Sequence, residues 1–133
     1  MKKNHEDVHL AIVDDDPLIA EFIKHFAELK GFQVTTFLGG EPFLKYFSNN
    51  TVDALVLDVM MPDMDAFDVI RAVKNMENPP EIFLCSGKEE IFMDGAEQVA
   101  RGSGLQVFGR IKKPINAEEL QKQLSDLYDH VSH

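Results

Sequence analysis

Cysteine, basic charge and long hydrophobic runs are all scarce in this chain, and each scarcity excludes a class of protein. The single cysteine, Cys85, cannot form an internal disulfide. It lies inside the apolar run IFLCSG, which predicts a small buried core residue rather than a nucleophile. This cysteine usage is typical of a reducing compartment.

Basic residues are outnumbered, because 13 Lys and Arg stand against 23 Asp and Glu, for a formal net charge of -10. Such a field repels nucleic acid phosphates and anionic membranes, so we expect no direct contact with nucleic acid or membrane. The start MKKNHEDVHL lacks an apolar stretch of signal-peptide length, and no segment approaches the roughly 18 apolar residues that span a bilayer. The sequence therefore predicts a cytoplasmic protein.

What the chain does contain is the composition of one globular domain. Its 133 residues are 44% hydrophobic and 27% charged. That is enough for a single core, so we expect one domain over residues 1–133 with its core at about 8–131. Phenylalanines at helical spacing are expected in this core, namely Phe22, Phe26, Phe43, Phe47 and Phe67.

Short apolar runs alternate with segments whose apolar residues recur at helical spacing. The expected strands are residues 9–13, 32–37, 53–58, 81–87 and 105–111. The expected helices are residues 17–30, 39–49, a segment around 67–73, 88–102 with an interruption at Gly95, and 116–131. This alternation predicts an α/β fold, a doubly wound five-stranded parallel sheet covered by helices on both faces.

Polar residues follow these strands at the point where each ends. Asp14 and Asp15 follow the first strand, and Asp58 ends the third. Ser86 ends the fourth, and Lys113 follows the fifth. The carboxyl ends of parallel strands lie at one edge of a sheet, where ligands bind, so we expect these side chains to converge.

Three converging carboxylates repel one another by roughly 4 kcal/mol per pair at about 4 Å and an effective dielectric near 20. A cation must offset this cost, and Mg²⁺, which prefers oxygen ligands, fits such a site. Lys113 would add a second positive charge. Asp16 has a separate role, because Asp followed by Pro17 is typical of a helix start.

This set of groups suits phosphoryl transfer. The metal and Lys113 would neutralise phosphoryl oxygens, and the Ser86 hydroxyl would donate to another. Asp58 is the best candidate for the nucleophile because it stands alone at its strand end. Asp14 and Asp15 are adjacent and suit a paired metal cradle.

The motifs VDDDP, LVLDVMMPDMD, FLCSG and KKP together resemble the receiver domain of two-component response regulators, over essentially the whole chain. The resemblance implies a flavodoxin-like receiver fold with strand order 2-1-3-4-5 and five helices. It implies Mg²⁺-dependent transfer of a phosphoryl group from a sensor histidine kinase or histidine phosphotransfer protein. Such a domain is a regulatory switch and catalyses only its own phosphorylation and dephosphorylation.

Carried onto this chain, the resemblance makes Asp58 the phosphoacceptor and Asp14 and Asp15 metal-binding residues. Asp58 and the backbone carbonyl of Met60 would complete the metal site. Ser86 becomes the switch hydroxyl, and Lys113 contacts the phosphate. An output domain, an effector protein or a second copy in a homodimer would dock on the face formed by the fourth helix, fifth strand and fifth helix.

The chain departs from the family pattern at several positions. Arg110 stands where most receivers have an aromatic residue that couples to the switch hydroxyl, and Ala66 stands where glycine is usual. Met60 and Lys88 occupy variable positions that tune water access. The run GLQVFGRIKKP also resembles receivers attached to cyclic-di-GMP phosphodiesterase domains, although the chain holds no catalytic phosphodiesterase residues.

Two alternative functions remain open from the sequence. A degenerate receiver that acts only as a phosphorylation-independent docking module is favoured by Arg110 and disfavoured by the complete acid, serine and lysine set. A small Mg²⁺-dependent aspartyl-phosphate phosphatase would need a second acid two residues after the nucleophile, and that position is Met60.

Overall fold

The computed structural model describes residues 8–61, 66–87 and 90–132. Within this part of the chain, five parallel strands form one sheet in the order β2-β1-β3-β4-β5, which confirms the predicted fold class and strand order. The strands are β1 (His9–Val13), β2 (Gln33–Phe37), β3 (Ala54–Asp58), β4 (Glu81–Ser86) and β5 (Val107–Lys112).

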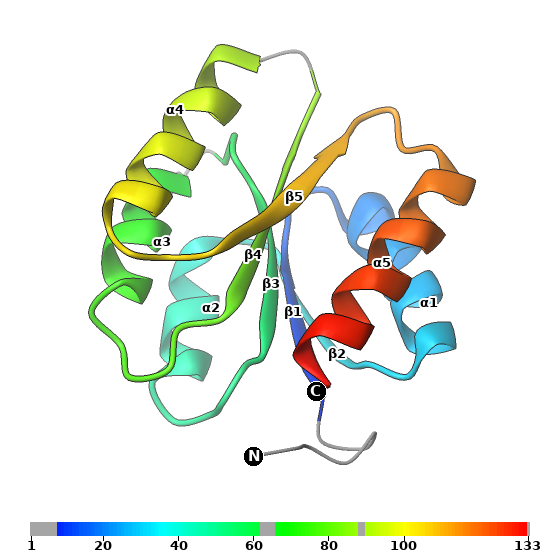
Figure 1. Ribbon diagram of the computed structural model, residues 1–133, viewed down its shortest axis with the longest axis horizontal. Coiled ribbons are helices and arrows are strands. Elements are labelled where there is room, and N and C mark those ends of the chain that lie inside the picture. The colour runs from blue at the N-terminus through cyan, green and yellow to red at the C-terminus, as the bar shows by residue number, and fades with distance from the viewer. Residues whose placement is uncertain (1–7, 62–65, 88–89, 133) are drawn as a thin grey trace.

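Helices cover both faces of this sheet, with α1 and α5 on one side and α2, α3 and α4 on the other (Figure 1). Their bounds are α1 (Pro17–Lys30), α2 (Gly40–Phe47), α3 (Ala66–Val73), α4 (Glu90–Gly102) and α5 (Ala117–Val131). Among the described residues, no helix has the length and apolar character needed to cross a membrane.

Alternation along the central strands divides the core into two clusters. In β1, Leu10 and Ile12 pack toward α1 and α5, whereas Ala11 and Val13 pack toward the opposite helices. Because both faces are covered, successive residues are all buried, which explains why these strands are nearly continuous in apolar residues.

The end of β1 turns directly into α1 through a side-chain cap. The Asp16 carboxylate accepts a hydrogen bond from the backbone N–H of Leu18 at 3.0 Å, and Pro17 is the first helical residue. The helix ends at Gly31, whose φ of 113° is favourable only for glycine. The predicted helix start at Asp16 is therefore confirmed.

Two local expectations were wrong. α4 runs through Gly95 without interruption. This glycine packs against the Phe67 ring of α3, and a Cβ added to it would lie 3.4 Å from Phe67 Cζ. Phe22 is 38% exposed, because the buried stripe of α1 is formed by its neighbours, namely Ala20, Ile23 and Ala27. Phe43, by contrast, is fully buried as expected.

Candidate functional site

The carboxyl edge of the sheet gathers three aspartates. Asp14 follows β1 and Asp58 ends β3, and both are almost fully buried, whereas Asp15 is exposed. Asp14 and Asp58 are held by local backbone donors, since Asp16 N–H donates to Asp14 Oδ1 at 2.9 Å and Met60 N–H donates to Asp58 Oδ1 at 3.1 Å. One oxygen from each of the three aspartates lies within 4.8 Å of the others. The predicted convergence of these side chains is therefore observed.

Lys113 supplies the positive charge that faces this cluster. Its backbone N–H donates to the carbonyl of Ser86 at 2.9 Å, which fixes the start of the loop after β5 beside the end of β4. Its Nζ then lies 3.0 Å from Asp14 Oδ2 and 3.5 Å from Asp58 Oδ2. One lysine is thus shared between two buried carboxylates.

Asp15, Asp58 and Lys113 line a cleft of about 510 Å³ that opens to solvent. Asp58 lies within it, and Met60, 45% exposed, lies at the same cleft. Asp16 and Pro17, predicted only as a helix start, also form part of the wall, together with Gly87, which follows Ser86. These residues follow the ends of β1 and β4, and this position in the chain indicates that they lie at the same edge of the sheet.

Burial and charge act against each other at Asp58. Burial, and next the nearby Asp14 carboxylate, raise the pKa of Asp58 from 3.8 to about 7, although the Met60 N–H and Lys113 oppose this shift. For Lys113, burial lowers the pKa, but Asp14 and Asp58 outweigh that effect and raise it above its ordinary value. Negative charge at this edge therefore exceeds what one lysine neutralises.

The donor set fits a hard divalent cation. Three carboxylates offer oxygen ligands at close range, and Mg²⁺ is bound by such groups together with water. Burial first, and then the negative charge of Asp14, raise the pKa of Asp58, and a bound cation would offset both effects. The site can therefore hold a metal on Asp14, Asp15 and Asp58.

Ser86 provides a hydroxyl group inside the same cleft. It is only 2% exposed, and its Oγ has no hydrogen-bond partner among the described residues. A buried hydroxyl without a partner costs about 1–3 kcal/mol. Its position in the cleft wall leaves it available to an oxygen atom of a ligand.

Two further residues of the sequence argument lie outside the cleft. Cys85 is fully buried, and burial raises the pKa of its thiol to about 12, so it is a core residue and not a nucleophile at neutral pH. Arg110 points to α4 instead, where it forms ion pairs with Asp94 and Glu97. Lys88, expected to tune water access, lies outside the described residues.

Known proteins share this fold and this sequence pattern. A model of the family described as "Response regulator receiver domain" matches residues 10–125. The curated relative "Response regulator SaeR" from Staphylococcus epidermidis is 32% identical over 125 residues, which are 93% of this chain and 52% of the relative. "Probable transcriptional regulator ycf27" from Cyanidium caldarium is 29% identical over 95% of this chain and 48% of the relative.

Among solved structures, a response regulator from Colwellia psychrerythraea superimposes with a TM-score of 0.79 at 32% identity, over 92% of this chain and 98% of that one. The chain belongs to the response regulator receiver domain family. It spans about half the length of the curated relatives it matches. The class of protein predicted from its motifs, a regulatory domain of two-component signalling, is thereby confirmed.

Proposed function

We propose that this receiver domain is a phosphorylation-dependent switch in which Asp58 accepts a phosphoryl group. The observation that carries the proposal is the position of the Asp58 carboxylate. It lies in an open cleft, with one oxygen bound by the Met60 N–H and the other 3.5 Å from Lys113 Nζ. A carboxylate held in this way is oriented for attack on an electrophile that enters the cleft.

The phosphodonor would be the phosphohistidine of a sensor histidine kinase or of a histidine phosphotransfer protein. An Asp58 oxygen attacks the phosphorus, the P–N bond breaks, and the imidazole leaves with the electron pair of that bond. The products are an aspartyl phosphate and a free histidine. We place this reaction in the cytoplasm, because a single cysteine within an apolar run is typical of a reducing compartment.

Lys113 and Ser86 would bind the transferred group. Lys113 already lies between two carboxylates, so its ammonium can move to a phosphoryl oxygen as negative charge grows on Asp58. The Ser86 hydroxyl, buried at the end of β4, can donate to a second oxygen. Phosphorylation therefore replaces ion pairs within the site by contacts to the new group.

Asp14, Asp15, Asp58 and the Met60 carbonyl would hold Mg²⁺. When bound, the ion neutralises carboxylate repulsion and the charge that develops on the phosphoryl oxygens. The support for this proposal is the close approach of the three carboxylates and the raised pKa of Asp58. Met60 places an apolar side chain where a hydrolase would need a second acid, so we favour a switch over a phosphatase.

Beryllofluoride, which mimics an acyl phosphate, gives a direct binding test. Because the chain has no tryptophan, isothermal titration calorimetry is a better readout than intrinsic fluorescence. We expect binding with Mg²⁺ and none with EDTA, loss of binding in Asp58→Asn, and no change in Asp126→Asn, which removes an exposed carboxylate of α5. A wild-type protein that binds neither Mg²⁺ nor beryllofluoride would instead favour a docking module independent of phosphorylation.

A further inference from the structure

Among the described residues of α4, Met93 is the one large apolar side chain that is fully buried. The clearly buried side chains of this helix are Met93, Ala96 and Ala100, and two large residues of its first turns, Ile91 and Phe92, are 78% and 45% exposed. α5 instead buries three leucines and a tyrosine, namely Leu120, Leu124, Leu127 and Tyr128. Because hydrophobic stabilisation scales with the apolar area buried, α4 depends more than α5 on other contacts.

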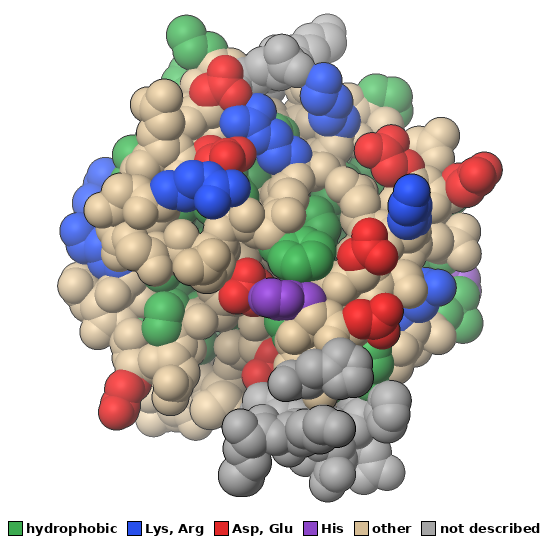
Figure 2. All heavy atoms as spheres, viewed as in Figure 1, with side chains coloured by type: hydrophobic (Ala, Val, Ile, Leu, Met, Phe, Trp, Pro, Cys, Tyr) green, Lys and Arg blue, Asp and Glu red, His purple; other side chains and the backbone are tan. Residues whose placement is uncertain are grey.

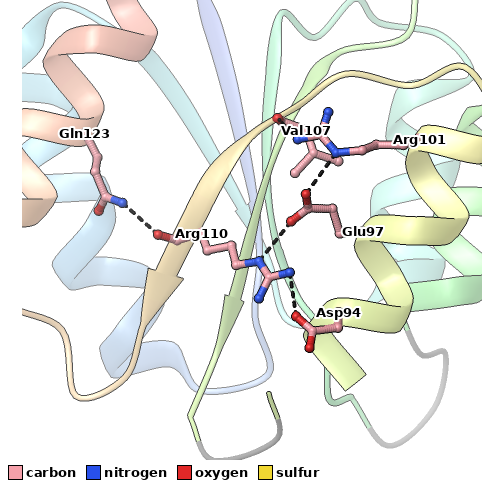
Figure 3. A network of polar contacts seen from close by, with 6 residues as sticks. All are labelled: Asp94, Glu97, Arg101, Val107, Arg110 and Gln123. Atoms are coloured by element: carbon pink, nitrogen blue, oxygen red, sulfur yellow. Dashed lines mark hydrogen bonds and ion pairs between the residues drawn. The ribbon is translucent and has the colours of Figure 1, made fainter. Parts of the chain in front are cut away.

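Those other contacts are ion pairs centred on Arg110 of β5 (Figure 3). Arg110 Nη2 lies 2.7 Å from Asp94 Oδ1, and Arg110 Nε lies 2.9 Å from Glu97 Oε1. The other Glu97 oxygen accepts from Arg101 Nε at 2.8 Å, and Arg101 Nη2 donates to the Val107 carbonyl at 3.2 Å. We name Asp94, Glu97, Arg101 and Arg110 the Arg110 latch.

The latch connects α4 to both ends of β5. Arg110 lies near the carboxyl end of the strand, and Val107 is its first residue. Figure 2, in the same view as Figure 1, shows acidic and basic side chains intermixed over α4 and β5. Hydrogen bonds from Arg101 and Arg110 lower the pKa of Glu97, so Glu97 is ionised at neutral pH.

A bulge in β5 turns Arg110 toward α4. Ile82 pairs with Val107, but the next residue of β4, Phe83, pairs with Gly109, so Phe108 is an extra residue in β5. Arg110 is thereby opposite Leu84, whose side chain belongs to the core cluster beneath α4. Without the extra residue, strand alternation would turn position 110 to the α5 face.

Arg110 is also tied to the phosphorylation site and to α5. It lies three residues before Lys113, and the same ladder continues through Ser86 paired with Lys112. On the other side, Gln123 Nε2 of α5 donates to the Arg110 carbonyl at 2.6 Å (Figure 3). A shift of the β5 end therefore moves a residue that contacts both helices.

We propose that the Arg110 latch positions α4 on β5 and that its opening is coupled to occupation of Asp58. The coupling to Asp58 rests on the proposed function. A group bound at Asp58 draws Ser86 and Lys113 toward its oxygens, and this displaces the paired ends of β4 and β5. Asp94 and Glu97 then lose their alignment with Arg110, and α4 is released from β5.

Hydrogen exchange over residues 93–102 tests the latch without any phosphodonor. Glu97→Gln keeps the size of the side chain and removes its charge, and we expect exchange in α4 to rise about three- to fivefold. Raising the salt concentration should accelerate exchange in the wild type, and by a smaller factor in this variant, which keeps the Arg110–Asp94 pair. Arg71→Gln, which breaks the exposed Arg71–Asp68 pair within α3, is the matched control and should leave α4 unchanged.

Beryllofluoride affinity then tests the coupling. Because linkage is reciprocal, Glu97→Gln should bind beryllofluoride with Mg²⁺ tighter by about the factor by which α4 opening increased. The double variant with Arg110→Gln should gain less than the sum of the two single variants, because both substitutions break the Arg110–Glu97 pair and only Arg110→Gln also breaks the Arg110–Asp94 pair.

Unchanged α4 exchange in Glu97→Gln would overturn the latch. Faster exchange with unchanged affinity, in a wild type that binds beryllofluoride, would overturn the coupling. A wild type that binds no beryllofluoride would contradict the proposed function, and the exchange result would still decide whether the latch exists.

Discussion

At the scale of single residues, burial makes the ionised form of Asp58 unfavourable, and a bound cation would offset this free-energy cost. Its pKa is raised to about 7, first by burial and then by Asp14, so its ionised form is unfavourable in the folded protein. A carboxyl group whose folded-state pKa is raised contributes stability that is present at low pH and is lost as the pH rises through about 7. Asp58 therefore destabilises the metal-free fold increasingly as the pH rises from 3.8 toward about 7, and most strongly above that value.

We expect Asp58→Asn to raise the free energy of unfolding at pH 8 by about 2 kcal/mol in EDTA, because the amide removes the buried charge and keeps an acceptor for the Met60 N–H. The gain should shrink as the pH falls from 8 to 5. Urea unfolding followed by circular dichroism measures both. An Asp58→Asn protein less stable than wild type at pH 8 would contradict this account.

The same residues show how much of the site could be predicted from the sequence. Asp14, Asp58, Ser86 and Lys113 could be assigned to one place because each follows a parallel strand, and the structure brings them together. The direction of Arg110 could not be predicted. It depends on the extra residue in β5, which changes the strand alternation and leaves no trace in the hydrophobic pattern.

At the scale of the elements, the glycine of the β5 bulge is a steric requirement. A Cβ on Gly109 would lie 2.6 Å from Phe83 Cε1, and Phe83 is only 2% exposed, so the ring has little room to move. The bulge that turns Arg110 toward α4 therefore depends on a residue without a side chain. In α4, by contrast, a Cβ on Gly102 would meet no described atom within 4 Å beyond its own stretch of helix.

Gly109→Ala should lower the free energy of unfolding by about 1–3 kcal/mol, because the added methyl group forces the Phe83 ring or the strand to shift. Gly102→Ala is the control and should change stability by less than about 0.5 kcal/mol. Thermal unfolding of both variants beside the wild type provides the comparison. An equally small loss of stability in both variants would contradict this expectation, because it would mean that β5 and Phe83 accommodate the methyl group without strain.

Elements with strong periodicity could be predicted, and their finer packing could not. The apolar runs located all five strands, and the Asp16–Pro17 start of α1 is confirmed by its cap. The predicted interruption at Gly95 was wrong. A glycine within a helical pattern can mark either a break in the helix or a place where another side chain packs closely against the helix backbone. Only the position of the Phe67 ring distinguishes the two.

At the scale of the whole molecule, the sheet connects a charged edge to α4, which the Arg110 latch joins to β5. The carboxylates lie at the carboxyl ends of the central strands, and β5 lies at the sheet border between α4 and α5 (Figure 1). Phosphorylation adds close to two negative charges to a protein of net charge -10, at a site where negative charge is already in excess. In the switch that we propose, a local change of charge at Asp58 would displace α4.

Intact-mass spectrometry after incubation with acetyl phosphate tests whether Asp58 accepts a phosphoryl group in a metal-dependent reaction. We expect one added phosphoryl group on the wild type with Mg²⁺, none with EDTA, and none on Asp58→Asn. A wild type that stays unmodified with Mg²⁺, or an Asp58→Asn variant that is modified as fully as the wild type, would contradict this role of Asp58.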